Sequence, residues 1–273
     1  MKKGSSEGLI DFNVDQTVGD DLLIAEGFVR LFSEAVMKSS PKSIDIFNYN
    51  IQKAKILLGL SYKIMDVLPL IVEYSKEPEA PPSSSPWIGL ISGIEKAIER
   101  GSASYFVFTE QAVVTSVSAT EIYYRDRLAE SINSDLRIAK RFANKEIYIT
   151  IDQLFQIDFE LKSEIGIFLV EKIDFQKVDN SISSYEKAFG NKFGNKMLNH
   201  DEIVTLKKIF EIRHLFVHKA GKVDNKFISN TNIQGDIGSH FVVTRKQVSE
   251  IINFLEKIVN RSEDLISKKG SEK

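Results

Sequence analysis

Residues 201–224, DEIVTLKKIFEIRHLFVHKAGKVD, carry the clearest structural pattern in the chain. Their apolar side chains recur at helical spacing: Leu206, Ile209, Phe210, Ile212 and Phe216. Such a stripe is typical of an amphipathic helix that packs on a core. Gly221 is the predicted C-cap, and Lys219 suits the negative end of the helix dipole. We therefore predict a helix over residues 201–219.

The remaining sequence predicts further helices and no alternation of strands with helices. Helical periodicity extends over residues 20–37, 43–75, 87–100, 110–138, 151–173 and 179–189, and from residue 244 onward. Thr150 and Gln153 form a predicted capping box, Gly190 ends one helix, and Thr244 caps the last. Residues 221–243 are rich in Asn, Gly and Ser and predict an extended loop that could contain a short hairpin. No glycine-rich nucleotide-binding pattern occurs, so the predicted fold class is all-α.

The chain divides at one visible place. Residues 76–86 hold four of the six prolines and three consecutive serines, which predicts a linker or long loop. We accordingly predict an N-terminal helical region at 1–80, a linker with a short helix at 81–104, and a helical domain at 105–273. The N-terminal helices could form a small domain, or they could dock on the C-terminal part.

Composition restricts the chemistry that the protein can perform. The chain has no cysteine, which excludes disulfides, thiol catalysis and cysteine-ligated metals. No run of 18 apolar residues occurs and the first residues contain no apolar signal region, so we expect no membrane span, no signal peptide and a cytoplasmic location. The net charge of −2 argues against a protein that coats nucleic acid.

Positive charge is concentrated around the 201–219 helix. Six lysines and arginines face only two acids between Thr205 and Lys226, a balance of +4. This pattern favours an RNA site confined to one cleft, with Lys208, Lys219 and Lys222 as the predicted phosphate contacts. A solvated helix face explains the lysines equally well.

The same helix contains the pattern Arg213-His214-x-x-x-His218, which uses two of the chain's four histidines. Arginine can neutralise charge that grows on a phosphate, and imidazole moves protons near neutral pH. Together they suit metal-free cleavage of RNA. Three other interpretations stay open: Arg213 pairs with a glutamate such as Glu121, His218 binds the last helix carbonyls, or both histidines ligate zinc. A zinc site would need a third ligand from His200, His240 or Asp224.

The segment Arg213-His214-Leu-Phe-Val-His218, followed by Gly221-x-Val-Asp, resembles the Arg-x4-6-His motif of the HEPN superfamily. A weaker resemblance lies in residues 118–128, SATEIYYRDRL. The match covers roughly residues 105–268. It implies a HEPN-like helical bundle, with RNA-cleaving members in bacterial toxin–antitoxin and anti-phage systems, and a homodimer whose motif helices face each other across a shared cleft.

The roles that follow need neither metal nor cofactor. Arg213 would stabilise the transition state, His218 would transfer protons, His214 would position the phosphate, and Glu121 would orient Arg213. Products would carry 2′,3′-cyclic phosphate and 5′-OH ends, because the ribose 2′-OH attacks the phosphate.

One geometric fact complicates a site within a single chain. Residues five apart on a helix differ by about 140° in direction, so Arg213 and His218 do not share a face. Either the helix loosens near its end or a second copy completes the site. A non-catalytic HEPN-like dimer that binds RNA, nucleotide or a partner protein such as an antitoxin is the alternative, and a zinc-dependent hydrolase is a third.

Overall fold

The computed structural model describes residues 41–74, 102–142 and 149–271. Its regular elements within these ranges are helices, and the only β-type pairing there is an isolated bridge between Lys222 and His240. The predicted all-α fold class is therefore confirmed. The helices predicted at 20–37 and 87–100, and the linker at 76–86, lie outside the described residues. In the described part, no helix is long and apolar enough to cross a membrane.

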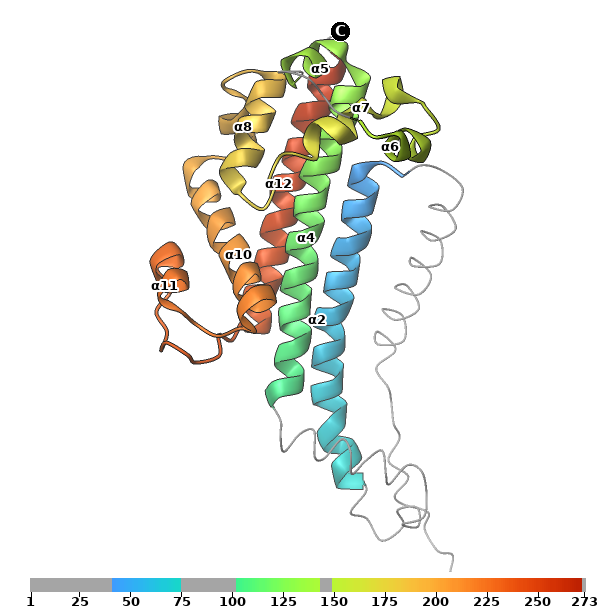
Figure 1. Cartoon of the computed structure of the whole chain (residues 1–273). Helices are drawn as coiled ribbons and strands as arrows, with labels where there is room; N and C mark the ends of the chain where they lie inside the picture. Colours follow the sequence, from blue (N-terminus) through green and yellow to red (C-terminus); the bar gives the residue numbers. More distant parts are fainter. Residues whose placement is uncertain (1–40, 75–101, 143–148, 272–273) are drawn as a thin grey trace, which may run out of the picture. The chain divides into compact units, whose positions relative to one another are not determined.

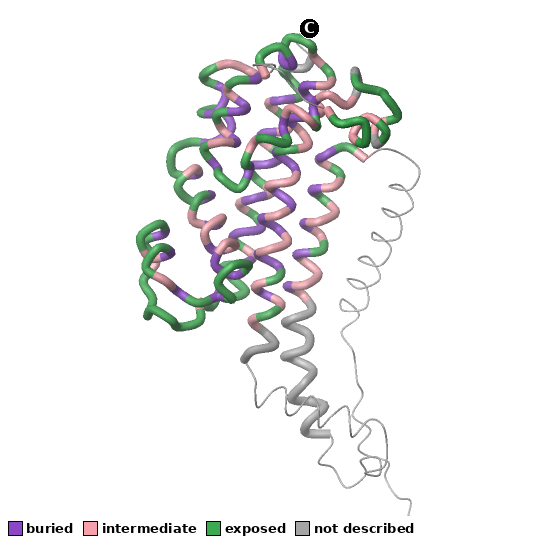
Figure 2. The backbone as a smooth tube through the Cα atoms, in the orientation of Figure 1, coloured by how far each residue is buried: buried purple, intermediate pink, exposed green. Residues whose placement is uncertain are grey.

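A long helix, α4 (Ser102–Ser134), lies at the centre of the described structure. It runs between α2 (Ser43–Tyr74) on one side and α12 (Arg245–Ser271) and α10 (His200–Lys219) on the other (Figure 1). Figure 2 shows buried residues along α4 and α12. On α4 they recur at helical spacing and include Val113, Val117, Tyr124 and Leu128. The core therefore forms where the apolar stripes of these helices meet.

The N-terminal helix α2 shares this core. Phe47, Ile51 and Ala54 are fully buried, and the Phe47 ring lies 5.7 Å from that of Tyr123 on α4. The described helices all belong to one compact unit, which begins at Lys42. Of the two arrangements that the sequence leaves open for this region, α2 takes the second, because it docks on the helices that follow.

The helix predicted over 110–138 is interrupted at Asp135. There α4 ends and α5 (Leu136–Phe142) begins. The Asp135 carboxylate accepts hydrogen bonds from both the main chain and the side chain of Arg137, at 2.9 Å each. An aspartate that binds its own downstream N–H starts a new helix more readily than it continues an old one.

The helix predicted over 151–173 is also two helices, α6 (Ile151–Gln156) and α7 (Leu161–Val170). The predicted capping box at Thr150 and Gln153 is present. Asp158 and Phe159 between the helices adopt positive φ angles of 48° and 60°, which no helix tolerates. Beyond the break, α7 approaches α4 so closely that a Cβ at Gly166 would overlap the Ala129 carbonyl oxygen.

The C-terminal half follows its predicted outline more closely. Helix α8 (Val178–Phe189) ends at Gly190, and Thr244 with Gln247 caps α12, both as predicted. A short helix, α9 (Phe193–Met197), precedes α10. The segment predicted as an extended loop instead contains α11 (Asn225–Thr231), although the Lys222–His240 bridge forms in it.

The contribution of α2 to the common core can be tested by mutation. Phe47→Ala should lower the free energy of unfolding by about 3–5 kcal/mol, because it empties a fully buried aromatic site between two helices. Asn48→Ala, at the exposed neighbouring position, should leave stability nearly unchanged. Chemical denaturation followed by circular dichroism measures both. An equal, small effect for the two variants would mean that α2 does not belong to the core.

Candidate functional site

The helix that carries the Arg-His pattern is fixed at both ends. At its start, Asn199 and Glu202 form a capping box, with the Glu202 N–H donating to the Asn199 side chain at 2.9 Å. At its end, Ala220 adopts a left-handed conformation with φ of 49°, and Gly221 follows with φ of 74°. The Gly221 N–H donates to the Leu215 carbonyl at 3.1 Å. The helix therefore ends where predicted, although Ala220 rather than Gly221 occupies the C-cap.

Arg213 and the two histidines project from different faces of α10. Arg213 follows Ile209 by four residues and precedes Phe216 by three, and both of these neighbours are buried. It therefore shares the core-facing side of the helix. Its Nε atom is buried and has no hydrogen-bond partner in the described part of the chain.

His214 and His218 form a pair on the outer side of the helix. Their ring centroids lie 4.7 Å apart with the planes inclined at 44°. His214 is half-buried and His218 is exposed. Partial burial lowers the pKa of His214 below its ordinary value, and repulsion by His218, Lys226 and Arg213 adds to this, while Glu211 opposes it. Two adjacent imidazoles, one held neutral, are suited to moving protons in both directions.

His214 borders a hollow of about 150 Å³ between α10 and α11, and the His218 ring lies against His214. The hollow is lined by Glu211, His214, Leu215, Lys219, Asp224, Lys226 and Phe227. Asp224 accepts a hydrogen bond from the Phe227 N–H at 2.8 Å, and this bond, with the nearby lysines, lowers its pKa. It also lies 3.6 Å from the Lys219 ammonium. The cap of α11 thus holds Lys219 and Lys226 beside the imidazoles.

Several predicted site residues do not join this hollow. No salt bridge connects Arg213 to Glu121 within the described residues, so the proposed orientation of Arg213 by that carboxylate is not formed in one chain. Lys208 is partly buried outside the hollow, and Lys222 is exposed on the following loop. Lys226 and Phe227, by contrast, line the hollow but were not predicted as site residues. They lie on α11, a helix that the sequence did not predict and that packs next to α10.

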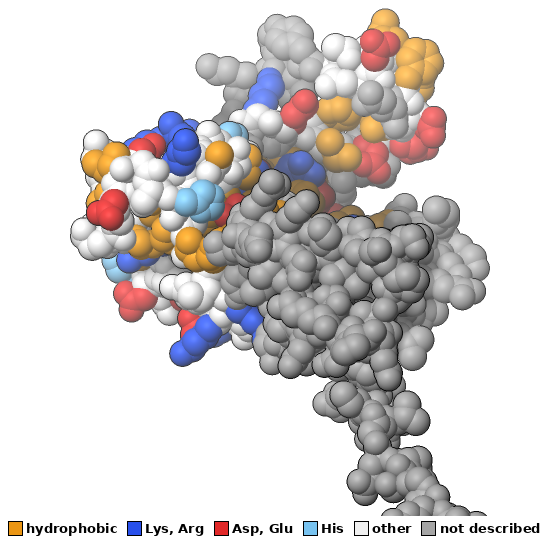
Figure 3. All heavy atoms as spheres, turned by 90° about the horizontal axis from the view of Figure 1, so that it is seen from below, with side chains coloured by type: hydrophobic (Ala, Val, Ile, Leu, Met, Phe, Trp, Pro, Cys, Tyr) orange, Lys and Arg blue, Asp and Glu red, His pale blue; other side chains and the backbone are white. Residues whose placement is uncertain are grey.

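A third histidine lies close to the end of α10. The His240 ring covers Gly221, where a Cβ would meet its Nε2, and it lies 3.5 Å from the Glu110 carboxylate of α4. Burial raises the pKa of Glu110, and His240 partly offsets the effect. Phe241 packs on Phe227 with ring centroids 5.1 Å apart, which fixes the loop against α11. Figure 3 shows this end of the bundle from below, with histidine and basic side chains at the surface.

No group of three potential His, Asp or Glu ligands comes together in the described residues. His214 and His218 alone could contribute two ligands to a metal ion. A zinc site would need a third ligand, for which the sequence offers His200, His240 and Asp224. None of these completes such a group with the two histidines in the described residues. The geometry gives the zinc interpretation no support.

In comparisons with known proteins, no family model, no curated protein and no solved structure matches the chain. The HEPN resemblance of residues 118–128 and 211–224 therefore stays a prediction from the sequence. The functional argument depends on the geometry of α10 and its neighbours.

The contact between the two imidazoles predicts coupled titration. His218→Gln and Lys226→Gln should each raise the pKa of His214, because each removes a repelling charge, whereas Glu211→Gln should lower it further. Lys222→Gln, which removes an exposed charge outside this group, should change nothing. NMR titration of the ring C–H signals measures the shifts. A His214 signal that titrates identically in all four variants would contradict this geometry.

Proposed function

We propose that the protein is a metal-independent endoribonuclease that cleaves RNA to 2′,3′-cyclic phosphate and 5′-OH ends. The observation that carries the proposal is the ring contact between His214 and His218 beside a hollow that holds Lys219 and Lys226. The lysines attract the phosphate, and the imidazoles handle the protons. As the HEPN resemblance implies, the enzyme would act as a bacterial toxin or in anti-phage defence, with an antitoxin or defence protein as partner.

The lowered pKa of His214 assigns it the role of general base. Neutral His214 takes the proton of the ribose 2′-OH while the 2′-oxygen forms a bond to phosphorus. Protonated His218 gives its proton to the 5′-oxygen as the P–O5′ bond breaks. The sequence assigned phosphate positioning to His214, and in this scheme Lys219 and Lys226 take over that task.

RNA can extend beyond the histidine hollow along α10. A second hollow of about 390 Å³ lies between α8 and α10, and it shares Glu211 with the first. Lys177 and Lys207 line it, each already paired with an aspartate at about 3 Å. The two hollows together provide a path for several nucleotides, with phosphate contacts on either side of the imidazoles.

Arg213 enters this scheme only through a second copy of the chain. In one chain its guanidinium and the His218 imidazole project from different faces of α10. A two-fold axis that brings two α10 helices together can place Arg213 of one copy beside His218 of the other. The site of the proposed homodimer would then contain residues from both chains.

A non-catalytic dimer that binds RNA, nucleotide or a partner protein is the second candidate. The observation that favours it is the position of Arg213, whose buried Nε has no hydrogen-bond partner among the described residues and which does not line the hollow beside His214. If Arg213 serves packing alone, Lys219 and Lys226 can still bind phosphate groups at the hollow. Such a module would lack the charge stabilisation that phosphodiester cleavage needs.

Cleavage of labelled RNA in excess EDTA tests the proposed activity. His214→Ala and His218→Ala should each lower the rate by at least about 100-fold, because each removes a proton-transfer step. His200→Ala, at the opposite end of the same helix, should keep wild-type activity. The wild-type rate should fall as the pH drops through the pKa of His214, which lies below the ordinary 6.5. Binding without cleavage by the wild type would favour the second candidate.

Mixing two inactive variants tests whether the site is shared between chains. Arg213→Ala and His218→Ala should each be inactive alone, while an exchanged one-to-one mixture should recover about a quarter of wild-type activity, since half the dimers are mixed and each has one intact site. Light scattering establishes the dimer beforehand. A mixture as inactive as its components, or a monomeric wild type, would contradict the shared site.

A further inference from the structure

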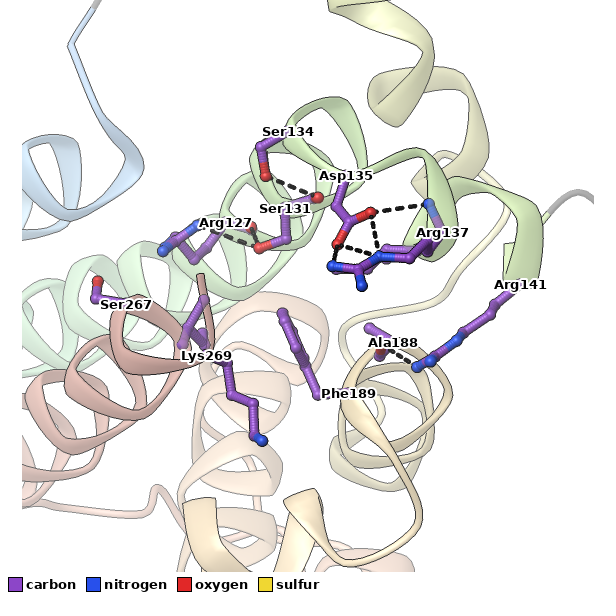
Figure 4. Close-up of a pocket in the computed structure, with 12 residues that line it drawn as sticks. Arg127, Ser131, Ser134, Asp135, Arg137, Arg141, Ala188, Phe189, Ser267 and Lys269 are labelled. Atoms are coloured by element: carbon purple, nitrogen blue, oxygen red, sulfur yellow. Dashed lines mark hydrogen bonds and ion pairs between the residues drawn. The ribbon is translucent and has the colours of Figure 1, made fainter. Parts of the chain in front are cut away.

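A larger cavity lies far from the histidine pair, at the end of the bundle where α4, α5, α8 and α12 meet. Its volume is about 460 Å³, within the range of small-molecule sites. Arg127, Arg137, Arg141 and Lys269 line it, against a single carboxylate from Asp135. In Figure 4 the ends of Arg137, Arg141 and Lys269 surround the ring of Phe189. The lining therefore carries a balance of +3, four cations less one carboxylate.

The three arginines differ in how far their charges are compensated. Arg127 donates to the Glu263 carboxylate at 2.7 Å and to Ser131 at 3.1 Å. Arg137 binds Asp135 through Nε and Nη2. Arg141 donates only to a main-chain oxygen, that of Ala188 at 2.5 Å, and no carboxylate pairs with it in the described structure. Within the described ranges, no carboxylate therefore compensates the positive charge of Arg141.

Arg141 has an ordinary structural role as well, since its contact to Ala188 satisfies a carbonyl near the end of α8. That contact uses one of the five N–H groups of the guanidinium. Its Nε and Nη2, with Nη1 of Arg137, are free for a ligand among the described residues. The hydrogen bond to the Ala188 carbonyl therefore explains where the Arg141 side chain lies. It does not explain the remaining N–H groups of the guanidinium.

One wall of the cavity is apolar. Phe189 contributes an aromatic ring, and Ile138 and Ile266 add aliphatic surface. Phe189 is held in place by Phe193, with ring centroids 4.7 Å apart, and by a stacked contact with Tyr185 at 6.1 Å. A fixed aromatic wall beside unused guanidinium donors favours a ligand with one apolar end and one anionic end.

We propose that this cavity binds a small organic phosphate, a phosphate monoester that carries an aromatic or apolar group. Guanidinium groups match phosphate oxygens through paired N–H donors, which a single charge-compensated lysine does not. Arg141 and Arg137 bind the phosphate, and the apolar group packs on Phe189. The site shares no residue with the histidine pair, so the proposal does not depend on the ribonuclease activity.

Calorimetric titration of the full chain with phenyl phosphate tests the proposal. Inorganic phosphate and phenol are titrated separately, because they represent the anionic and the aromatic part of that ligand. Phenyl phosphate should bind more tightly than either half. Arg141→Gln removes the positive charge and the guanidinium donors, and it should weaken binding about tenfold or more. Arg137→Gln should weaken binding to a smaller extent, because part of its charge already serves Asp135.

Lys140→Gln provides the matched control, because Lys140 lies next to Arg141 on α5, is exposed and does not line the cavity. It should bind phenyl phosphate as the wild type does. Melting temperatures close to the wild type's show that the variants are folded. No binding by the wild type at about 10 mM ligand, or equal weakening in Lys140→Gln and Arg141→Gln, would overturn the proposal. Equal affinity for phenyl phosphate and inorganic phosphate would overturn the assignment of an apolar ligand group.

Discussion

The carboxylate of Glu263 on α12 connects the helices on which both candidate sites depend. It accepts hydrogen bonds from the Tyr123 hydroxyl at 2.9 Å and from the Arg127 guanidinium at 2.7 Å, both on α4. Burial would raise the pKa of Glu263, but the hydrogen bonds from Arg127, Ser267 and Tyr123 hold it below its usual value. Removing one member of a buried ion pair leaves the other charge without a partner, which is strongly destabilising. The carboxylate therefore fixes the register of α4 against α12.

The same helix α12 also fixes α10. Two residues before Glu263, Arg261 donates through both terminal nitrogens to Glu202, at 3.1 and 2.5 Å. Glu202 is in addition the N3 residue of the capping box that starts α10. One carboxylate thus caps the start of α10 and anchors that helix to α12, and its pKa is lowered chiefly by the hydrogen bonds from Arg261. The ion pair between Arg261 and Glu202 therefore fixes the start of α10, and with it the direction in which the helix carries the histidine pair.

The sequence predicted helices well wherever an apolar stripe was long and the ends carried capping residues, as in α8, α10 and α12. It failed where a local interaction competed with periodicity. At Asp135 the side chain accepts a hydrogen bond from the Arg137 main-chain N–H, and Asp158 and Phe159 adopt left-handed backbone conformations. Helix α11 was not predicted because its segment is mostly polar, and its main apolar anchor, Phe227, packs on Phe241 from the following loop.

The sequence predicted the candidate sites only in part, for the same reason. Helical geometry predicted correctly that Arg213 and His218 diverge, because that angle depends on one helix only. It could not predict that α11 returns Lys226 to the histidines. Nor could any spacing pattern reveal the cavity around Arg141, because α8 and α12, which complete its walls, lie far from α4 and α5 in the sequence.

The arginines of the described structure divide into those that bind a carboxylate of the protein and those that do not. Arg125, Arg127, Arg137 and Arg261 each bind a carboxylate within 3 Å. Arg141 and Arg213 have no carboxylate partner within the described residues. A fold with an overall charge of −2 has more than enough acids to neutralise both. Among the described residues no carboxylate compensates either charge, and in the two proposals the phosphate of the ligand would supply the counter-charge.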